Sequence, residues 1–168
     1  VVVINGRGAD PAAYQRIVDH LDRIRVIAES SLRAHVDSRN DFPMRAGVAS
    51  SSSAFAALSL AATRALGVRL GRRALSILAR KGSGSACRSI PDGFVEWFAG
   101  ESDGTSFAQS LAPPDHWALR IVTVTFKGQT KRISSRQGHR AAPTSPFYPT
   151  RLGRLPATLQ TVRAAIRD

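Results

Sequence analysis

The chain of 168 residues carries 24 Lys and Arg against 12 Asp and Glu, which gives a formal net charge of +12. Its hydrophobic content of 43% is enough to bury a core and excludes a disordered tail. A single cysteine, Cys87, excludes an internal disulfide and a cysteine-rich zinc site. No apolar run approaches the roughly 18 residues of a membrane span, and the apolar start at residues 1–4 is too short for a signal-peptide core. We therefore expect a cytoplasmic protein without a membrane partner.

The positive charge is concentrated in the last third of the chain. Residues 116–168 contain ten basic side chains and one acidic side chain, Asp168, so this stretch carries +9 of the net +12. A strongly basic surface is typical of proteins that bind a polyanion or a phosphorylated substrate. The charge alone leaves both classes open.

The first third of the chain has the pattern of a strand, a helix and a second strand. Residues 1–4 form a β-branched run followed by an Asn-Gly turn signal, which predicts a strand. An Asp-Pro pair then marks a helix start, and apolar side chains at helical spacing extend the predicted helix over 11–31. Alternating apolar residues predict a second strand over 33–38.

The rest of the chain combines further helices and strands. Small and apolar residues predict helices over 48–66 and 72–80, and a glycine ends the first of them. Apolar, β-branched and aromatic residues predict strands over 94–98 and 119–126. Apolar spacing predicts a last helix over 155–167. The mixture indicates an α+β fold in which helices pack on a partly antiparallel sheet.

Two loops of small residues have the composition of phosphate-binding sites. Residues 43–53 lead into a predicted helix, whose first N–H groups lack partners and whose positive dipole end attracts anions. Residues 82–88 alternate glycine with serine and end in Arg88, whose guanidinium can bind a carboxylate or a phosphate with two hydrogen bonds. Each loop alone is equally compatible with a local structural role, as a serine cap or a turn.

A third cluster lies further along the chain. Residues 131–136 combine basic side chains with two serines, which suits phosphate binding as well as a solvated face. The four histidines have no metal-ligand spacing, so no metal site built from protein ligands is predicted.

Several stretches, taken in order, resemble one enzyme family. They are residues 5–7, 40–43, 46–51, 79–89, 93–97, 115–117, 134–138 and 144–146. Their sequence is similar to that of the mevalonate diphosphate decarboxylases (diphosphomevalonate decarboxylases) of the GHMP kinase superfamily. The run 79–89 is the most specific, because the kinases of the superfamily share only the first loop. The Ser-Ser-Arg sequence at 134–136 resembles the bacterial branch of the family.

The resemblance implies a fold and a domain. We expect an α+β fold like the GHMP-kinase N-terminal domain (ribosomal protein S5 domain 2-like), with helices packed on a mostly antiparallel sheet. Residues 1–168 would form a partial ATP- and substrate-binding domain, incomplete at both ends. The family's Lys-Tyr-Trp-Gly-Lys motif and its Asp-Ala-Gly-Pro-Asn segment, which holds the catalytic aspartate, have no counterpart among the 168 residues. This chain alone is therefore expected to be inactive. Residues 103–106 depart from the family, because the stretch is shorter and lacks a second aspartate.

The resemblance also implies a reaction in isoprenoid biosynthesis, in the mevalonate pathway. ATP, with Mg²⁺, would phosphorylate the 3-hydroxyl of mevalonate 5-diphosphate. Loss of phosphate and carbon dioxide would then yield isopentenyl diphosphate and ADP. Such an enzyme must position and neutralise several anions, and a basic chain suits that task. The family also implies a homodimer.

The matching motifs assign expected roles to particular residues. Two are expected to be catalytic: Ser51 beside the transferred γ-phosphate, and Arg88 on the substrate carboxylate. The residues expected to hold the ATP phosphates are Ala46, Gly47, Val48, Ala49, Ser50, Ser51 and Ser52. The residues expected to contact the substrate are Asn40, Ser83, Ser85, Arg88, Ser135 and Arg136.

Other functions stay open at this point. A mevalonate 5-phosphate decarboxylase or a mevalonate 3-kinase would carry similar loops, although Ser83, Ser85 and Arg88 favour decarboxylation. A non-catalytic fragment of the enzyme is a further alternative. The net charge of +12 also suits an RNA-binding module. We disfavour it and expect no nucleic acid partner, because the basic residues are not interleaved with aromatic ones.

Overall fold

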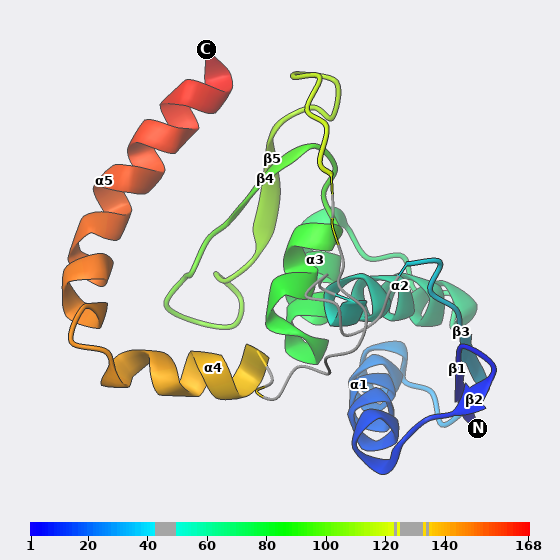
Figure 1. The fold of residues 1–168 in the computed structure, drawn as a ribbon. Coiled ribbons are helices and arrows are strands. Elements are labelled where there is room, and N and C mark those ends of the chain that lie inside the picture. Colours follow the sequence, from blue (N-terminus) through cyan, green and yellow to red (C-terminus); the bar gives the residue numbers. More distant parts are fainter. Residues whose placement is uncertain (43–49, 123, 125–132, 134) are drawn as a thin grey trace.

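The computed structural model describes residues 1–42, 50–122, 124, 133 and 135–168. The elements in chain order are β1 (Val2–Ile4), β2 (Arg7–Gly8), α1 (Pro11–Ala28), β3 (Val36–Ser38), α2 (Ser50–Ala65), α3 (Arg72–Gly82), the 3₁₀ helix η1 (Gly84–Ser89), β4 (Phe94–Trp97), β5 (Ala108–Ala112), α4 (Ser135–Ala141), the 3₁₀ helix η2 (Ala142–Thr144) and α5 (Tyr148–Arg167). Figure 1 shows α1, α2 and α3 gathered together, with β1–β3 next to α1 and with β4 and β5 next to α3. The mixed α+β class expected from the sequence is confirmed.

Both ends of the first helix, α1, are set by capping residues. The carboxylate of Asp10 accepts a hydrogen bond of 2.9 Å from the backbone N–H of Ala13, and a proline occupies the first helical position. The helix ends at Ala28, and the capping residue Glu29 adopts a left-handed conformation with φ of 49°. Its buried face carries His20, Leu21 and Ile24. The helix predicted over 11–31 is thus confirmed, with an end three residues earlier.

The strands in the described part of the chain form two small sheets rather than one. β1 pairs antiparallel with β2 and parallel with β3, while β4 and β5 form an antiparallel pair. Of the three strand pairings among the described residues, two are therefore antiparallel, as expected. The strands predicted over 1–4, 33–38 and 94–98 are confirmed in shorter form.

The strand predicted over 119–126 is wrong for the residues that the structure describes. Residues 119–122 and 124 carry no regular structure, and Ile121 is 91% exposed. The partner of β4 is instead β5, a segment without β-branched residues whose Ala108 and Ala112 are buried. β-Propensity describes how a side chain fits a half-buried pleated surface. A segment that pairs with β4 and contacts α3 therefore forms the strand, whereas the β-branched run pairs with no described strand.

The core lies where α1, α2 and α3 meet. One buried cluster contains Leu21, Ile24, Leu75 and Leu78, and a second contains Phe55, Ala79 and Ala86. The helix predicted over 72–80 is confirmed as α3, and the helix predicted over 48–66 is confirmed as α2 from Ser50 onward, because residues 48 and 49 lie outside the described residues; the two helices meet in this core. The core therefore places the beginning of α2 beside the end of α3.

The last part of the described chain, residues 135–168, is here called the C-terminal arm. It consists of α4, η2 and α5, and α5 has no buried residue. The helix predicted over 155–167 begins earlier, at Tyr148, and continues through Pro156. Glu96 of β4 holds the arm through two hydrogen bonds of 2.6 and 2.7 Å from the Arg163 guanidinium. Among the described residues, no helix combines the length and the apolar character that crossing a membrane requires.

Candidate functional site

The two serine-containing loops meet in the fold. Ser51 and Ser52 lie in the first turn of α2, whereas Ser83 and Ser85 lie at the junction of α3 and η1. The hydroxyls of Ser51 and Ser83 are hydrogen-bonded at 3.2 Å, and those of Ser52 and Ser85 are also hydrogen-bonded. We call this line of four hydroxyls the serine seam. It brings together loops that lie about 30 residues apart in sequence and were predicted separately.

The 3₁₀ helix η1 has some side chains in the core and others exposed to solvent. Ala86 and Cys87 are fully buried, whereas Arg88 is exposed. Ser76 of α3 holds this turn, because its hydroxyl donates to the carbonyl of Cys87 at 3.1 Å. Burial raises the pKa of the Cys87 thiol, so the thiol stays protonated and acts as a small apolar side chain.

Arg88 is available to an anion. In the part of the chain that the structure describes, the ion pairs involve other cations and leave Arg88 outside. Its guanidinium is permanently charged and presents a planar set of N–H donors that matches a carboxylate or a phosphate. The prediction of Arg88 as an anion-binding residue is compatible with this placement.

Asn40 and Ser51 line one cavity of about 430 Å³. The cavity lies between α1, α2 and the β1–β3 sheet, and its walls are mainly apolar, with Ile17 and Phe55 among them. Asn40 follows β3 and is held by a 2.8 Å hydrogen bond from its backbone N–H to the Oδ1 atom of Asn5. A residue predicted to contact the substrate and one predicted to contact the γ-phosphate thus line the same cavity.

Arg16, His20 and Phe55 pack around Gly82 next to the serine seam, and this cluster, here called the support, was not predicted from the sequence. Arg16 donates to the carbonyl of Gly82 at 3.2 Å, and its guanidinium lies 4.8 Å from the centre of the Phe55 ring. A Cβ atom on Gly82 would lie 2.2 Å from Phe55 and 2.9 Å from Nδ1 of His20, so only glycine fits there. Arg16 and His20 are four residues apart, which puts both on one face of α1. This spacing was the signal in the sequence from which their shared role could have been predicted.

His20 is fully buried in this support. Ser59 donates its hydroxyl proton to the carbonyl of Phe55 at 2.6 Å, so Nε2 of His20 must be the donor in its 2.8 Å hydrogen bond to Ser59. Nδ1 then carries no proton and has no hydrogen-bond partner among the residues that the structure describes. Burial, with a smaller contribution from the positive charge of Arg23, lowers the pKa of His20 to about 4. The imidazole is therefore neutral at pH 7.

The remaining predicted residues are placed as follows. Ser50 starts α2 beside the same cavity, whereas Ala46, Gly47, Val48 and Ala49 lie outside the described residues. Ser135 is exposed at the start of α4, in the C-terminal arm, and Arg136 follows it in the same helix. The described part of the chain brings no group of three or more His, Cys, Asp or Glu side chains close enough to hold a metal ion.

Comparisons with known proteins point in one direction. A family described as the diphosphomevalonate decarboxylase-like N-terminal domain matches residues 1–108. The diphosphomevalonate decarboxylases of Ganoderma lucidum and of human are each 41% identical over 143 residues. These alignments cover 82% of this chain, and they cover 36% and 35% of the two relatives. The chain thus spans about a third of these curated relatives.

Solved structures agree with the sequence matches. The crystal structure of mevalonate diphosphate decarboxylase from Staphylococcus aureus superposes with a TM-score of 0.84 at 36% identity, covering 99% of this chain and 51% of that one. The enzyme from Enterococcus faecalis superposes with a TM-score of 0.79 at 34% identity and covers 99% and 50%. Eukaryotic and bacterial relatives both match, so the bacterial-branch assignment stays a prediction. The chain belongs to the diphosphomevalonate decarboxylase family and has the GHMP-kinase fold of its N-terminal domain.

Proposed function

We propose that this chain provides the phosphate- and substrate-binding surface of an ATP-dependent decarboxylase that acts on mevalonate 5-diphosphate. The observation that carries the proposal is the serine seam, where Ser51 and Ser83 are hydrogen-bonded at 3.2 Å. It joins the loop assigned to ATP with the loop assigned to the substrate, as a direct transfer of a phosphoryl group requires. A related structure is a complex with MVAPP, AMPPCP and magnesium, which supports both ligand classes.

In the proposed reaction, the γ-phosphoryl group of ATP passes to the oxygen of the substrate 3-hydroxyl. The hydroxyl proton leaves to a general base, and we assign that role to no residue of this chain. The C–O bond then breaks and phosphate departs with the electron pair. The C–C bond to the carboxylate breaks next, and its electrons form the new double bond as carbon dioxide leaves. The products are isopentenyl diphosphate, ADP, phosphate and carbon dioxide.

The described residues suit particular parts of this reaction. The hydroxyls of Ser50, Ser51 and Ser52 at the start of α2 are donors for phosphate oxygens, in a region where the helix dipole favours negative charge. Arg88 would hold the substrate carboxylate until carbon dioxide departs. Mg²⁺ would be bound by ATP phosphate oxygens and would offset their charge.

Other assignments stay predictions that rest on the family resemblance. They are the contacts of Ala46–Ala49 with ATP, the contacts of Asn40, Ser83, Ser85, Ser135 and Arg136 with the substrate, the partial-domain organisation of residues 1–168, the homodimer, the lack of a nucleic acid partner and the cytoplasmic location.

The proposal is tested by titrating the chain with mevalonate 5-diphosphate and, separately, with ATP and Mg²⁺ in a calorimeter. We expect both to bind, and we expect Arg88→Gln to weaken mevalonate 5-diphosphate binding by about 10- to 100-fold, as loss of a hydrogen bond to a charged group predicts. Arg69→Gln is the matched control, because Arg69 is also an exposed arginine outside the described ion pairs. Equal affinity of the two variants would overturn the role of Arg88.

Competition and turnover separate the related activities. Tighter binding of mevalonate 5-phosphate than of the diphosphate would favour the monophosphate decarboxylase. ADP formed without an equal amount of carbon dioxide would indicate a mevalonate 3-kinase. We expect binding without turnover by this chain alone, because the family's segment with the catalytic aspartate has no counterpart in it.

A further inference from the structure

The loop between β4 and β5, residues 98–107, is held together by its own hydrogen bonds. The hydroxyl of Thr105 accepts from the backbone N–H groups of Glu101 and Ser102 at 3.0 and 2.9 Å. Gly100 adopts a φ of +66°, and a Cβ atom there would lie 2.4 Å from the backbone of Thr105. A loop ordered in this way presents Asp103 in a defined position.

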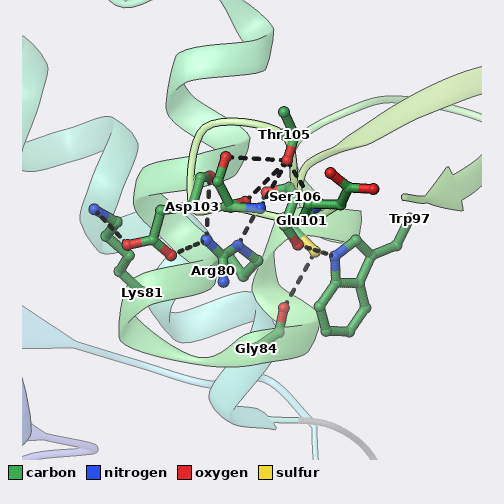
Figure 2. Close-up of polar contacts among 10 residues, drawn as sticks. Arg80, Lys81, Gly84, Trp97, Glu101, Asp103, Thr105 and Ser106 are labelled. Carbon is green, nitrogen blue, oxygen red and sulfur yellow. Dashed lines mark hydrogen bonds and ion pairs between the residues drawn. The ribbon is translucent and has the colours of Figure 1, made fainter. Parts of the chain in front are cut away.

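Asp103 binds two consecutive cations in the last turn of α3 (Figure 2). Its carboxylate lies 2.5 Å from Nη2 of Arg80 and 3.2 Å from Nζ of Lys81. Arg80 also donates to the backbone carbonyl of Asp103 at 3.2 Å. These hydrogen bonds lower the pKa of the Asp103 carboxyl, which is therefore ionised at neutral pH. The loop is thus bound to the end of α3 through the charged side chain of Asp103.

Further contacts fasten the same loop to α3 and to η1. Arg80 donates through Nε to the carbonyl of Ser106 at 3.0 Å, and the indole N–H of Trp97 donates to the Ser106 hydroxyl at 3.0 Å. Figure 2 shows the Trp97 ring beside Gly84, the first residue of η1. Ser76 completes the connection, because it accepts from the Ala108 N–H at 2.9 Å and donates to η1. The loop, α3 and η1 therefore form one hydrogen-bonded unit.

We propose that Asp103 is a positioning residue for the segment from Ser83 to Arg88. That segment starts directly after the turn of α3 that Asp103 holds, and it contributes half of the serine seam. The inference rests on the proposed function, in which this segment binds mevalonate 5-diphosphate. Asp103 acts through Arg80 and Lys81 and does not itself touch the ligand.

Positioning and electrostatics predict opposite changes in substrate affinity when the charge of Asp103 is removed. A loose end of α3 would misalign Ser83 and Ser85 and weaken substrate binding. A purely electrostatic effect would strengthen binding, because removal of a negative charge beside Arg80 and Lys81 makes the local potential more attractive to an anion. Positioning therefore predicts a loss of affinity where charge alone predicts a gain.

The test is calorimetry of the 168-residue chain carrying Asp103→Asn. We expect mevalonate 5-diphosphate to bind about tenfold more weakly, because a displaced binding group loses its alignment. ATP affinity should change less than about twofold, since its phosphates contact the start of α2 rather than the end of α3. Asp103→Glu, which keeps the charge, should restore part of the loss. The matched control is Asp92→Asn, which removes another exposed ion pair, with Arg72 at 3.2 Å.

Hydrogen exchange separates this proposal from the proposed function. In the ligand-free chain, the amides of Ser83 and Ala86 are hydrogen-bonded at 3.1 and 2.8 Å, and both should exchange faster in Asp103→Asn than in Asp92→Asn. A wild-type chain that binds no mevalonate 5-diphosphate would refute the proposed function, while faster exchange would still support the positioning role. Unchanged exchange, or unchanged or tighter substrate binding by Asp103→Asn, would overturn that role.

Discussion

The serine seam and the C-terminal arm are both rich in basic or polar residues, yet they use them differently. Around the seam, Arg16 donates to the Gly82 carbonyl and Arg80 donates to the loop that contains Asp103. In the arm, no residue of α5 is buried, and the ion pair from Arg163 to Glu96 ties the helix to the rest. The cations around the seam are therefore held by neighbouring groups, whereas the cations of α5 lie on a helix without a buried residue.

The difference shows what makes a cation or a hydroxyl useful to a binding site. Residues 116–168 carry most of the net charge and include all of the arm. The paired hydroxyls of the serine seam, in contrast, lie next to a packed core. A side chain binds selectively when its position is held by neighbours, because little conformational freedom is then lost on binding. We therefore expect substitutions in the core beneath the seam to change the free energy of unfolding strongly. Equivalent substitutions of exposed residues in the arm should change it little.

The largest contrast is expected for one pair of phenylalanines. Phe55 is 5% exposed and packs below the seam, so Phe55→Ala should lower the free energy of unfolding by about 3–5 kcal/mol. Phe147 is 79% exposed in the arm, and Phe147→Ala should change it by less than about 0.5 kcal/mol. Urea denaturation followed by circular dichroism measures both. Similar losses for the two variants would refute the contrast.

Acid should weaken the core through His20. Its pKa is lowered from 6.5 to about 4 by burial, so the unfolded chain binds a proton more readily than the folded chain. Stability from this group is complete above pH 6.5 and falls as the pH drops toward 4, by about 2–3 kcal/mol in total. Denaturation midpoints measured from pH 7 to pH 4 check this. His20→Gln should flatten this part of the pH profile, and an unchanged slope in the variant would assign the effect to other groups.

A smaller contrast concerns two glycines. A Cβ atom on Gly82 would lie 2.2 Å from the Phe55 ring, so Gly82→Ala should cost about 1–3 kcal/mol of stability. Gly153 lies in α5, where an added Cβ atom would have nothing within 4 Å, so Gly153→Ala should stabilise the helix by about 0.5–1 kcal/mol. Thermal unfolding of both variants gives the comparison. Opposite signs are the expected result, and a shared sign would contradict it.

The smallest effect on the core is expected from release of the arm. Arg163→Met removes both hydrogen bonds to Glu96 and should free α5 while leaving the seam intact. Limited trypsin digestion should then cut faster at Arg151 and Arg154, with no change in the hydrogen exchange of Ser83. Arg167→Met is the control, because Arg167 lies at the end of the same helix. Faster exchange at Ser83 would show that the arm supports the seam.

Much of the fold was predictable because the signals are local. Asp10 before a proline marks the start of α1, and apolar spacing outlines α2 and α3. The strand predicted over 119–126 failed because strand formation depends on a partner, and β4 pairs with the small residues of β5. The arm was only partly predicted, since α4 begins within a basic cluster that shows no apolar period.

The amino-acid sequence by itself determined the family, the two serine loops and the arginine that ends one of them, because motifs and their spacing lie along the chain. Only the tertiary structure decided that Ser51 meets Ser83, that His20 is buried and neutral, and that Asp103 grips the end of α3. Each of these facts depends on contacts between distant segments. Such contacts form only when the packing of α1, α2 and α3 brings those segments together.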